Sequence, residues 1–342
     1  MKTLLEYIIK AQKELESMPV SYGFDSVSII QEKNLCVSRL DADIKSEIFR
    51  EVYRPIPLIA SNMSTVVNAD FCIQLYKAGA LGIMHRATSD EIIISEIKKI
   101  SKECDITVAS IGIGNDQYEL ATKLIKAGAT GICIDVAHGY SDVVMDLGRK
   151  IKKNFKDVKL IIGNTVNPYM LGEVADFADA LKIGIGQGAA CTTKNTAGST
   201  EKQFSAVYKF KYLAKEYGLP IISDGGIREP ADFTKAIGAG ANSVMMGSKF
   251  AACNESAAEL VKVDGLFKKL YAGMASEYVQ KQWKGGLKPG TIAEGKVVYL
   301  DICGPVQDLL EAYAGALRSG ITYAGATNVK DFQDKVKFIR LA

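Results

Sequence analysis

The sequence is poor in the residues that build metal centres, disulfide frameworks, membrane spans and nucleic-acid surfaces. It has only two histidines in 342 residues, and its seven cysteines are scattered with no CxxC pair, which argues against a zinc site and a disulfide framework. No run of about 18 apolar residues occurs, so we expect no membrane association. Basic and acidic residues nearly balance at 42 and 39, without a basic stripe, so nucleic acid is not an expected partner.

Targeting signals are also lacking at the start of the chain. Residues 1–20 mix acidic side chains into an apolar pattern and contain no secretory h-region. Together with the unpaired cysteines, which are typical of a reducing compartment, this predicts a cytoplasmic protein. The hydrophobic content of 48% and the charged content of 24% are ordinary for a globular chain.

A strand-then-helix pattern begins at residue 57. Short, continuous apolar runs alternate with longer amphipathic stretches, and the eight runs are residues 57–61, 80–84, 106–112, 131–136, 159–164, 178–184, 220–226 and 242–248. Continuous apolar runs are typical of strands buried on both faces, and several amphipathic stretches open on Asn or Ser and close on Ala-Gly, as capped helices do. Eight such units predict a closed (β/α)8 TIM barrel of the α/β class. An open, doubly wound sheet is the alternative.

The barrel prediction locates a candidate site, because barrel active sites lie at the carboxyl ends of the strands. The segments SDGG (223–226) and MGS (246–248) follow the seventh and eighth runs, where barrels commonly bind a phosphate. Asp224 would repel a phosphate but suits the hydroxyl donors of a ribose. We therefore expect a purine or pyrimidine nucleotide monophosphate to bind here.

Cys191 is the expected nucleophile of this site. It lies in the glycine-rich stretch GIGQGAACTTKNTAG (184–198) after the sixth run, and a thiolate at a strand end is a strong nucleophile. The alternative is an inert loop thiol. His85 and His138 could act as general bases, although a structural role bonded to backbone is the commoner one for such isolated histidines.

These loops resemble the family of IMP dehydrogenase and GMP reductase, from about residue 22 to residue 342. The resemblance rests on SNMSTV (61–66), ALGIMHR (80–86), DVAHGYSD (135–142), GN (163–164), GIGQGAACTT (184–193), SDGGI (223–227), VMMGS (244–248), YAGMAS (271–276), AEGK (293–296) and GALRSGITYAGA (315–326). It implies one catalytic domain over residues 1–342, with a barrel core at about 57–261 and a flap and C-terminal segment at about 262–342. The second unit runs directly into the third, so no regulatory (CBS) domain is inserted.

The resemblance also implies roles for individual residues. Cys191 would attack C2 of a purine nucleotide to give a covalent thioimidate, with Thr193 and Glu294 handling protons. Residues expected around the nucleotide are Ser61, Met63, Asn164, Gly186, Gly188, Asp224, Gly226, Gly247, Ser248, Tyr271, Gly273 and Met274. Residues expected around a nicotinamide cofactor are Asp135, Gly112, Gly114 and His138. The backbone carbonyls of Gly184, Gly186 and Cys191 would hold a monovalent cation, potassium, as in many family members, which also form homotetramers.

Two activities share the thioimidate, and the sequence favours the reductive one, in which NADPH converts GMP to IMP and ammonia. The oxidative alternative, from IMP to XMP with NAD, needs a flap with an Arg-Tyr pair, and no arginine occurs between Arg228 and Arg318. Ala189 stands where the family usually has a phosphate-binding serine, and Gln187 and Ser64 also depart from the family pattern. These departures leave a third alternative, a purine-nucleotide-binding barrel without catalysis.

Overall fold

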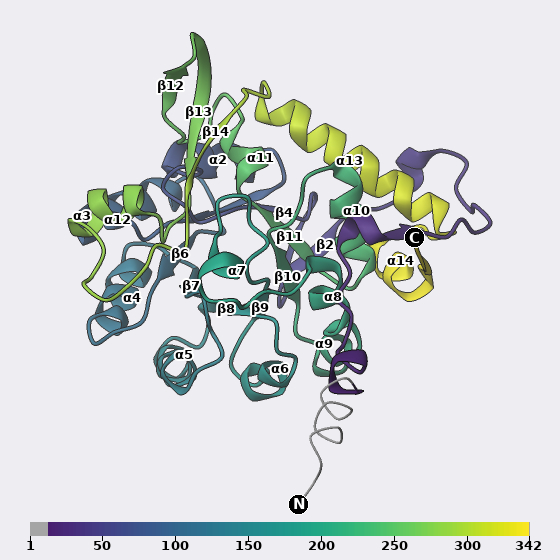
Figure 1. Ribbon diagram of the computed structural model, residues 1–342, viewed down its shortest axis with the longest axis horizontal. Coiled ribbons are helices and arrows are strands. Elements are labelled where there is room, and N and C mark those ends of the chain that lie inside the picture. The colour runs from purple at the N-terminus through teal and green to yellow at the C-terminus, as the bar shows by residue number, and fades with distance from the viewer. Residues whose placement is uncertain (1–12, 342) are drawn as a thin grey trace, which may run out of the picture.

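The computed structural model describes residues 13–341, and the expectations for residues 1–12 lie outside the described part. Eight parallel strands close into a barrel in the order β10-β11-β4-β5-β6-β7-β8-β9 (Figure 1). The strands are β4 (Leu58–Ala60), β5 (Leu81–Met84), β6 (Val108–Ile111), β7 (Gly131–Asp135), β8 (Lys159–Thr165), β9 (Ala180–Ile183), β10 (Ile221–Asp224) and β11 (Ser243–Met246). Each lies within a predicted run except β8, which extends one residue beyond its run, to Thr165. The (β/α)8 barrel is confirmed, and the open sheet is wrong.

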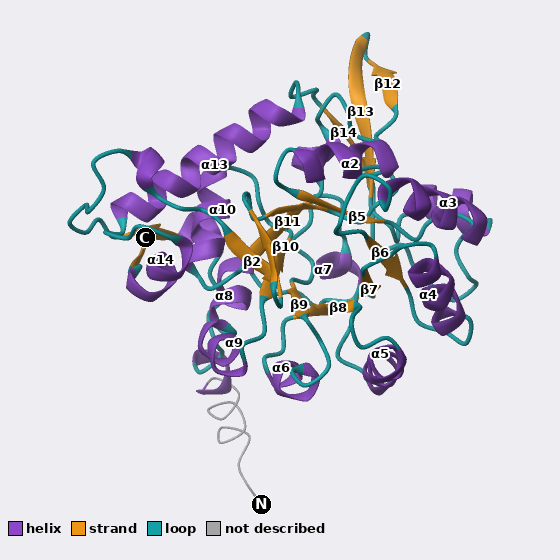
Figure 2. Cartoon of the chain, turned by 180° about the vertical axis from the view of Figure 1, so that it is seen from behind, coloured by secondary structure: helices purple, strands orange, loops and turns teal. Residues whose placement is uncertain are grey.

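Helices surround the barrel between successive strands, as Figure 2 shows from behind. They are α2 (Ala69–Lys77), α3 (Asp90–Ile100), α4 (Gln117–Lys126), α5 (Asp142–Asn154), α6 (Tyr169–Val174), α7 (Thr193–Thr196), α8 (Gln203–Tyr208), α9 (Lys211–Tyr217), α10 (Pro230–Gly238) and α11 (Ser248–Ala251). Asn68 caps α2 by accepting the Phe71 N–H at 2.9 Å. The amphipathic segment 201–218 forms two helices, α8 and α9. There the N–H of buried Phe210 bonds three residues back, to the Val207 carbonyl at 3.0 Å, in a tighter turn.

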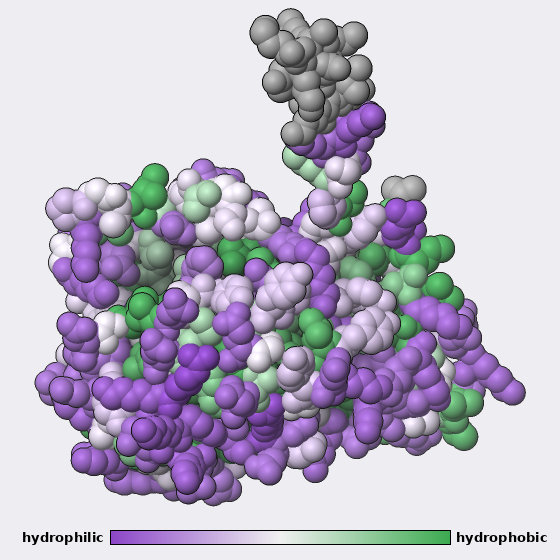
Figure 3. Space-filling view, turned by 90° about the horizontal axis from the view of Figure 1, so that it is seen from below, coloured by the Kyte–Doolittle hydropathy of each residue, from purple (hydrophilic) through white to green (hydrophobic). Residues whose placement is uncertain are grey.

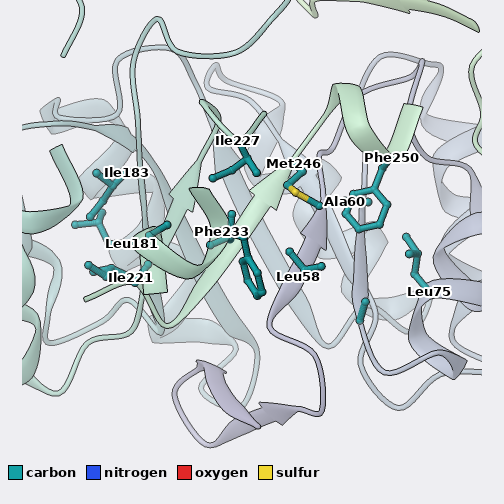
Figure 4. Packing of buried hydrophobic residues seen from close by; sticks show 14 of the residues in the cluster. Leu58, Ala60, Leu75, Leu181, Ile183, Ile221, Ile227, Phe233, Met246 and Phe250 are labelled. Atoms are coloured by element: carbon teal, nitrogen blue, oxygen red, sulfur yellow. The ribbon is translucent and has the colours of Figure 1, made fainter. Parts of the chain in front are cut away.

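Two apolar layers hold the barrel together. Figure 4 shows the outer layer, where Leu181, Ile183 and Phe233 are among the buried side chains packed between strands and helices. A separate inner cluster fills the barrel and includes Ile48 and Phe49. These two come from the hairpin of β2 (Ser46–Phe49) and β3 (Val52–Arg54), which closes the end of the barrel where the strands begin. Each such fully buried side chain stabilises the fold by roughly 1.5–3 kcal/mol.

The C-terminal part of the chain adds structure outside the barrel. An antiparallel sheet is formed by β12 (Leu260–Val263), β13 (Leu266–Ala272) and β14 (Val297–Leu300), and the β12–β13 hairpin projects from the molecule (Figure 1). Helix α12 (Glu277–Lys284) lies between β13 and β14 in the chain. Helix α13 (Val306–Tyr323) packs along α10 and is followed by α14 (Val329–Lys335).

Segments near the two ends of the described chain pair on one side of the barrel. Strand β15 (Phe338–Arg340) pairs antiparallel with β1 (Val27–Ile29), and the short 3-10 turns η1 (Phe24–Ser26) and η2 (Arg39–Asp41) flank this region. None of the helices in the described residues has the length and apolar character needed to cross a bilayer. The face shown in Figure 3 is largely hydrophilic, with apolar patches scattered between polar side chains.

Candidate active site

A pocket of about 810 Å³ opens at the carboxyl ends of the barrel strands. Its volume lies within the range of small-molecule and cofactor sites, roughly 300–1,000 Å³. The pocket wall includes every residue expected to touch the nucleotide and all three expected catalytic residues. These are Ser61, Met63, Asn164, Gly186, Gly188, Asp224, Gly226, Gly247, Ser248, Tyr271, Gly273, Met274, Cys191, Thr193 and Glu294. Residues from the ends of five strands, β4, β8, β9, β10 and β11, and from the C-terminal segment therefore meet in one cavity.

Cys191 forms one end of a line of three reactive side chains. Its Sγ lies 3.2 Å from the Thr193 Oγ1, which donates a hydrogen bond to Glu294 Oε2 at 2.7 Å. Because a hydroxyl has a single hydrogen, the Thr193 oxygen can only accept from the Cys191 thiol. A proton can therefore move from the thiol through the hydroxyl to the carboxylate.

Glu294 reaches this line because its segment is clasped to the cysteine loop. The Thr192 N–H bonds to the Glu294 carbonyl and the Lys296 N–H bonds to the Ala190 carbonyl, each at 2.9 Å. These bonds form an antiparallel bridge between Cys191 and Gly295. The loop itself turns through positive φ angles of 146° at Gly184 and 79° at Gly186, which glycine adopts without the strain of a side chain.

The other thiols of the chain contrast with Cys191. Cys72 and Cys133 are buried in the fold. Burial raises the pKa of Cys133 to about 12 and that of Cys72 further still. Such thiols stay protonated and unreactive, whereas Cys191 lies in the wall of the pocket. Cys303 also belongs to the pocket wall, but its Sγ contacts Cys253 Sγ at 3.6 Å, whereas Cys191 contacts the Thr193 hydroxyl. Cys191 is therefore the candidate nucleophile among the cysteines.

The nucleotide side of the pocket is built around Asp224 and Tyr271. Asp224, at the end of β10, accepts from Asn164 Nδ2 at 2.9 Å. Tyr271 is buried, which raises the pKa of its phenol, and its hydroxyl donates to Met63 Sδ at 3.5 Å. That hydroxyl lies 2.2 Å from where a Cβ on Gly247 would be, so only glycine leaves room for the tyrosine. The phenol therefore remains a neutral hydrogen-bond donor.

Lys182 is a residue of the site that the sequence analysis missed. It is 2% exposed, and its Nζ lies 2.7 Å from Asp224 Oδ2 and 2.8 Å from Asp135 Oδ1. Burial alone would lower the pKa of Lys182, but the charges of Asp135 and Asp224 outweigh it and raise that pKa. Burial alone would raise the pKa of Asp135, and its attraction to Lys182 instead holds that pKa below the usual range. The available signal was a lone lysine inside the apolar run ADALKIG.

Arg86 and Trp283 lie in another part of the pocket wall, and Lys284, which is not part of that wall, packs on the same ring. The Arg86 guanidinium lies 5.1 Å from the centre of the Trp283 ring, and Lys284 Nζ lies 4.1 Å from it. Arg86 Nε is buried and has no hydrogen-bond partner among the described residues. Burial, followed by repulsion from Arg86, lowers the pKa of Lys284. An anionic ligand would satisfy both cations.

The residues predicted for a cofactor are only partly brought together. Asp135 lies in the pocket wall, but Gly112, Gly114 and His138 do not. Gly112 lies directly behind Arg86, and its N–H is taken by Gln117 Oε1 at 2.7 Å. His138 is exposed. Asp135 is therefore the one predicted cofactor residue that the structure places in the cavity wall.

The surroundings of His85 fit a structural role and not that of a general base. It is buried, and its Nδ1 accepts the Ala87 N–H at 3.1 Å. Burial lowers the pKa of His85 to about 4, so the ring is neutral near pH 7. It does not form part of the pocket wall.

Comparison with known proteins agrees with this geometry. The IMP dehydrogenase / GMP reductase domain matches residues 21–342. GMP reductase 2 of Mus musculus is 33% identical over 330 residues, covering 94% of each chain. GMP reductase of Streptococcus pneumoniae (strain CGSP14) is 34% identical over 323 residues, covering 93% of this chain and 94% of its own. GMP reductase of Onchocerca volvulus is 33% identical, covering 93% of this chain and 90% of its own.

The chain belongs to the IMP dehydrogenase / GMP reductase family. The predicted family is thus confirmed. Within it, this chain presents Ala189 in the pocket wall where the family usually has serine, and the pocket wall also contains Arg228 and Lys249. Arg228 belongs to the loop that follows β10, and Lys249 belongs to the first turn of α11, which follows β11. Phosphate is expected to bind next to these two segments.

Among the described residues, no group of three or more His, Cys, Asp and Glu side chains could hold a metal ion. The predicted cation ligands are backbone carbonyls instead. The Gly184 carbonyl accepts from Asn164 Nδ2 at 2.8 Å, while Gly186 and Cys191 belong to the pocket wall. The cation site of the family therefore remains a prediction for this chain.

Proposed function

We propose that this protein is a GMP reductase, which converts GMP to IMP and ammonia with NADPH in purine nucleotide interconversion. The observation that carries the proposal is the Cys191–Thr193–Glu294 line in the wall of a nucleotide-sized pocket. The curated relatives support the same activity, since those described above are named GMP reductase over nearly their full length. Nothing in the geometry favours the oxidative alternative.

The chemistry starts at C2 of the guanine ring. Thr193 and Glu294 accept the thiol proton, and the Cys191 sulfur bonds to C2. The bond from C2 to the exocyclic nitrogen then breaks, and the same pair returns a proton to the departing amine, which leaves as ammonia. NADPH, when bound, supplies the hydride that replaces the amine at C2. Release of IMP breaks the sulfur–carbon bond and leaves a thiolate, and a proton taken up from solvent restores the thiol.

The nucleotide is held by groups at both ends. Asp224 accepts hydrogen bonds from the ribose hydroxyls, and Tyr271 adds a neutral donor. The loops carrying Gly226 and Ser248 supply backbone N–H groups to the phosphate. In this chain the nearby cations of Arg228 and Lys249 offset part of the loss of the hydroxyl that Ala189 lacks. Charge-assisted hydrogen bonds of this kind are worth about 1.5–3 kcal/mol each.

The basic stack is the feature that fits a phosphorylated dinucleotide. Arg86 Nε is a buried donor without a partner among the described residues, and such a donor is costly to leave unmet. Arg86 and Lys284 would hold cofactor phosphate, with Trp283 as an apolar platform. Asp135, which also lines the cavity, would accept from the nicotinamide end. The expected contacts from Gly112, Gly114 and His138 belong to the same proposal.

Four further features of the family are proposed for this chain. Potassium would bind the carbonyls of Gly184, Gly186 and Cys191, and the chain would assemble as a homotetramer. It would act as a single catalytic domain, since only helix α3 lies between β5 and β6. The cysteines in the structure are all unpaired, which supports the reducing cytoplasm as its location.

The proposal is tested by pairing two nucleotides with two cofactors. We expect NADPH absorbance to fall only when GMP is added, with one ammonia released for each NADPH consumed. NADH in place of NADPH measures what the Arg86–Lys284 stack contributes to cofactor choice. Oxidation of IMP with NAD, without turnover of GMP, would instead assign the dehydrogenase activity. Nucleotide binding with no product from any pair would assign a binding protein without catalysis.

A further inference from the structure

Lys182 is a buried charge that the proposed chemistry does not use. Removing an ammonium group from water is expensive unless it is paired and fully hydrogen-bonded. Lys182 meets that condition, because Nζ bonds to Asp135 Oδ1, to Asp224 Oδ2 and to Asn164 Oδ1. An ammonium group has three donors, so all of them are engaged. The three acceptors come from β7, β10 and β8, while Lys182 itself is on β9.

The neighbouring backbone makes room for this lysine. Leu181 and Ile183 belong to the outer apolar layer (Figure 4), so the alternation of a strand directs Lys182 into the barrel. On the adjacent strand, a Cβ at Gly163 would lie 2.6 Å from the Lys182 Cβ and 2.9 Å from its carbonyl oxygen. Only glycine at 163 allows β8 and β9 to approach there. The position of the lysine is thus built into two strands.

We propose that Lys182 is a positioning residue that holds two ligand-binding carboxylates in place at once. It fixes Asp224 against the ribose of the nucleotide and Asp135 toward the cofactor, so that the two binding sites share one cation. The inference rests on the proposed function, because that function assigns the two carboxylates to different ligands. Both of them line the pocket, with side-chain exposures of 18% for Asp224 and 20% for Asp135.

A purely structural ion pair between helix α5 and the residue just before β9 provides the contrast. Lys152 Nζ lies 2.7 Å from Asp179 Oδ2 near the start of β9, and it also donates to the Val158 carbonyl. The same Asp179 oxygen accepts the Leu160 N–H at 2.7 Å, and this carboxylate is only 7% exposed. The Asp179 carboxylate therefore has its hydrogen bonds within the protein and is not expected to bind a ligand. Lys152→Met is the matched control for Lys182→Met.

The experiment compares the affinities of GMP and 2′-deoxy-GMP by calorimetry, with thermal unfolding measured on each variant. For the wild type we expect GMP to bind about tenfold to hundredfold more tightly, the worth of a hydrogen bond to a charged group. Lys182→Met should reduce this preference to about threefold or less, because Asp224 loses its cation and its orientation. Lys182→Arg keeps the charge and should restore most of the preference. Lys152→Met should lower the unfolding temperature and keep the full preference.

The outcomes separate this inference from the proposed function. If the wild type binds GMP with the preference and Lys182→Met retains it, Lys182 is only structural and the inference is overturned. If the wild type binds neither nucleotide, the proposed function fails and the inference fails with it. Should Lys182→Met not fold, Lys182→Gln keeps two N–H donors without the charge and gives the same comparison. Binding of NADP⁺ alone should weaken in Lys182→Met as well and remain unchanged in Lys152→Met, which checks the Asp135 half.

Discussion

The two ends of the barrel use similar side chains for opposite purposes. Where the strands begin, Phe49 and its neighbours fill the barrel, and Asp179 is satisfied by Lys152 and backbone. Where the strands end, Lys182 pairs with two carboxylates that still face a cavity. A buried lysine–aspartate pair is thus not in itself a sign of function. What distinguishes the two ends is whether the carboxylate has acceptor capacity left for a ligand.

The largest expected effect is at the end that carries the cavity. Cys191→Ala should lower turnover of GMP by on the order of 10⁴-fold or more, because the covalent step cannot start. GMP affinity should stay close to that of the wild type, since the base, ribose and phosphate contacts remain. Steady-state rates and calorimetric binding check the two parts. Substantial remaining activity would remove Cys191 from the role of nucleophile.

A substitution at the closed end of the barrel, where the strands begin, should change only the stability of the protein. Phe49→Ala leaves a cavity in the inner cluster and should lower the free energy of unfolding by about 3–5 kcal/mol. The turnover rate per folded molecule should change little, because Phe49 is not part of the pocket wall. Denaturant titration gives the first quantity and turnover below the melting transition gives the second. A large loss of rate in folded protein would show that the two ends are not independent.

His85 should make the free energy of unfolding depend on pH. Its pKa is about 4 in the fold and about 6.5 in an unfolded chain, so the unfolded state binds the proton more tightly. Stability is therefore lost as pH falls from about 6.5 toward 4, by up to about 3 kcal/mol from this group. His85→Gln keeps an acceptor for the Ala87 N–H without titrating and should lack this part of the slope. Unfolding free energies at pH 7 and pH 4.5 measure it, and an unchanged slope would contradict the assignment.

The smallest effect is expected at the phosphate loops. Ala189→Ser adds one hydroxyl where the family usually has it and should tighten GMP binding by about threefold to tenfold. Inosine, which lacks the phosphate, should bind both forms equally. Equal gains for both ligands would mean that the serine acts on the loop rather than on phosphate. No gain for GMP would mean that Arg228 and Lys249 already satisfy the phosphate.

Local patterns were enough to predict the barrel, and the family motifs indicated three side chains that lie in contact. The eight apolar runs are buried strands, and the cysteine motif together with AEGK identified Cys191, Thr193 and Glu294, which the structure places in contact. Pairings between distant segments could not be predicted this way. The β1–β15 pair and the stacking of Arg86 on Trp283 depend on closure of the whole fold. They leave no periodic signal in the chain.

Lys182 shows a different limit of sequence reasoning. Within the run ADALKIG it interrupts the apolar pattern, and its meaning depends on carboxylates from β7 and β10. The carry-over of His138 and Gly114 from the family motif shows the reverse problem. A motif gives residue identity, but only the folded loop decides whether a side chain faces the cavity, and these two do not line it.

The alternation along β9 makes its register a matter of charge as well as packing. A shift of this strand by one residue would place the Lys182 ammonium group in the outer apolar layer. Asp135 and Asp224 would then be buried without a counter-ion. Misaligned barrels are thereby penalised at the strand that leads into the cysteine loop. Lys182 would therefore favour the correct register of β9 during folding, in addition to positioning the two carboxylates.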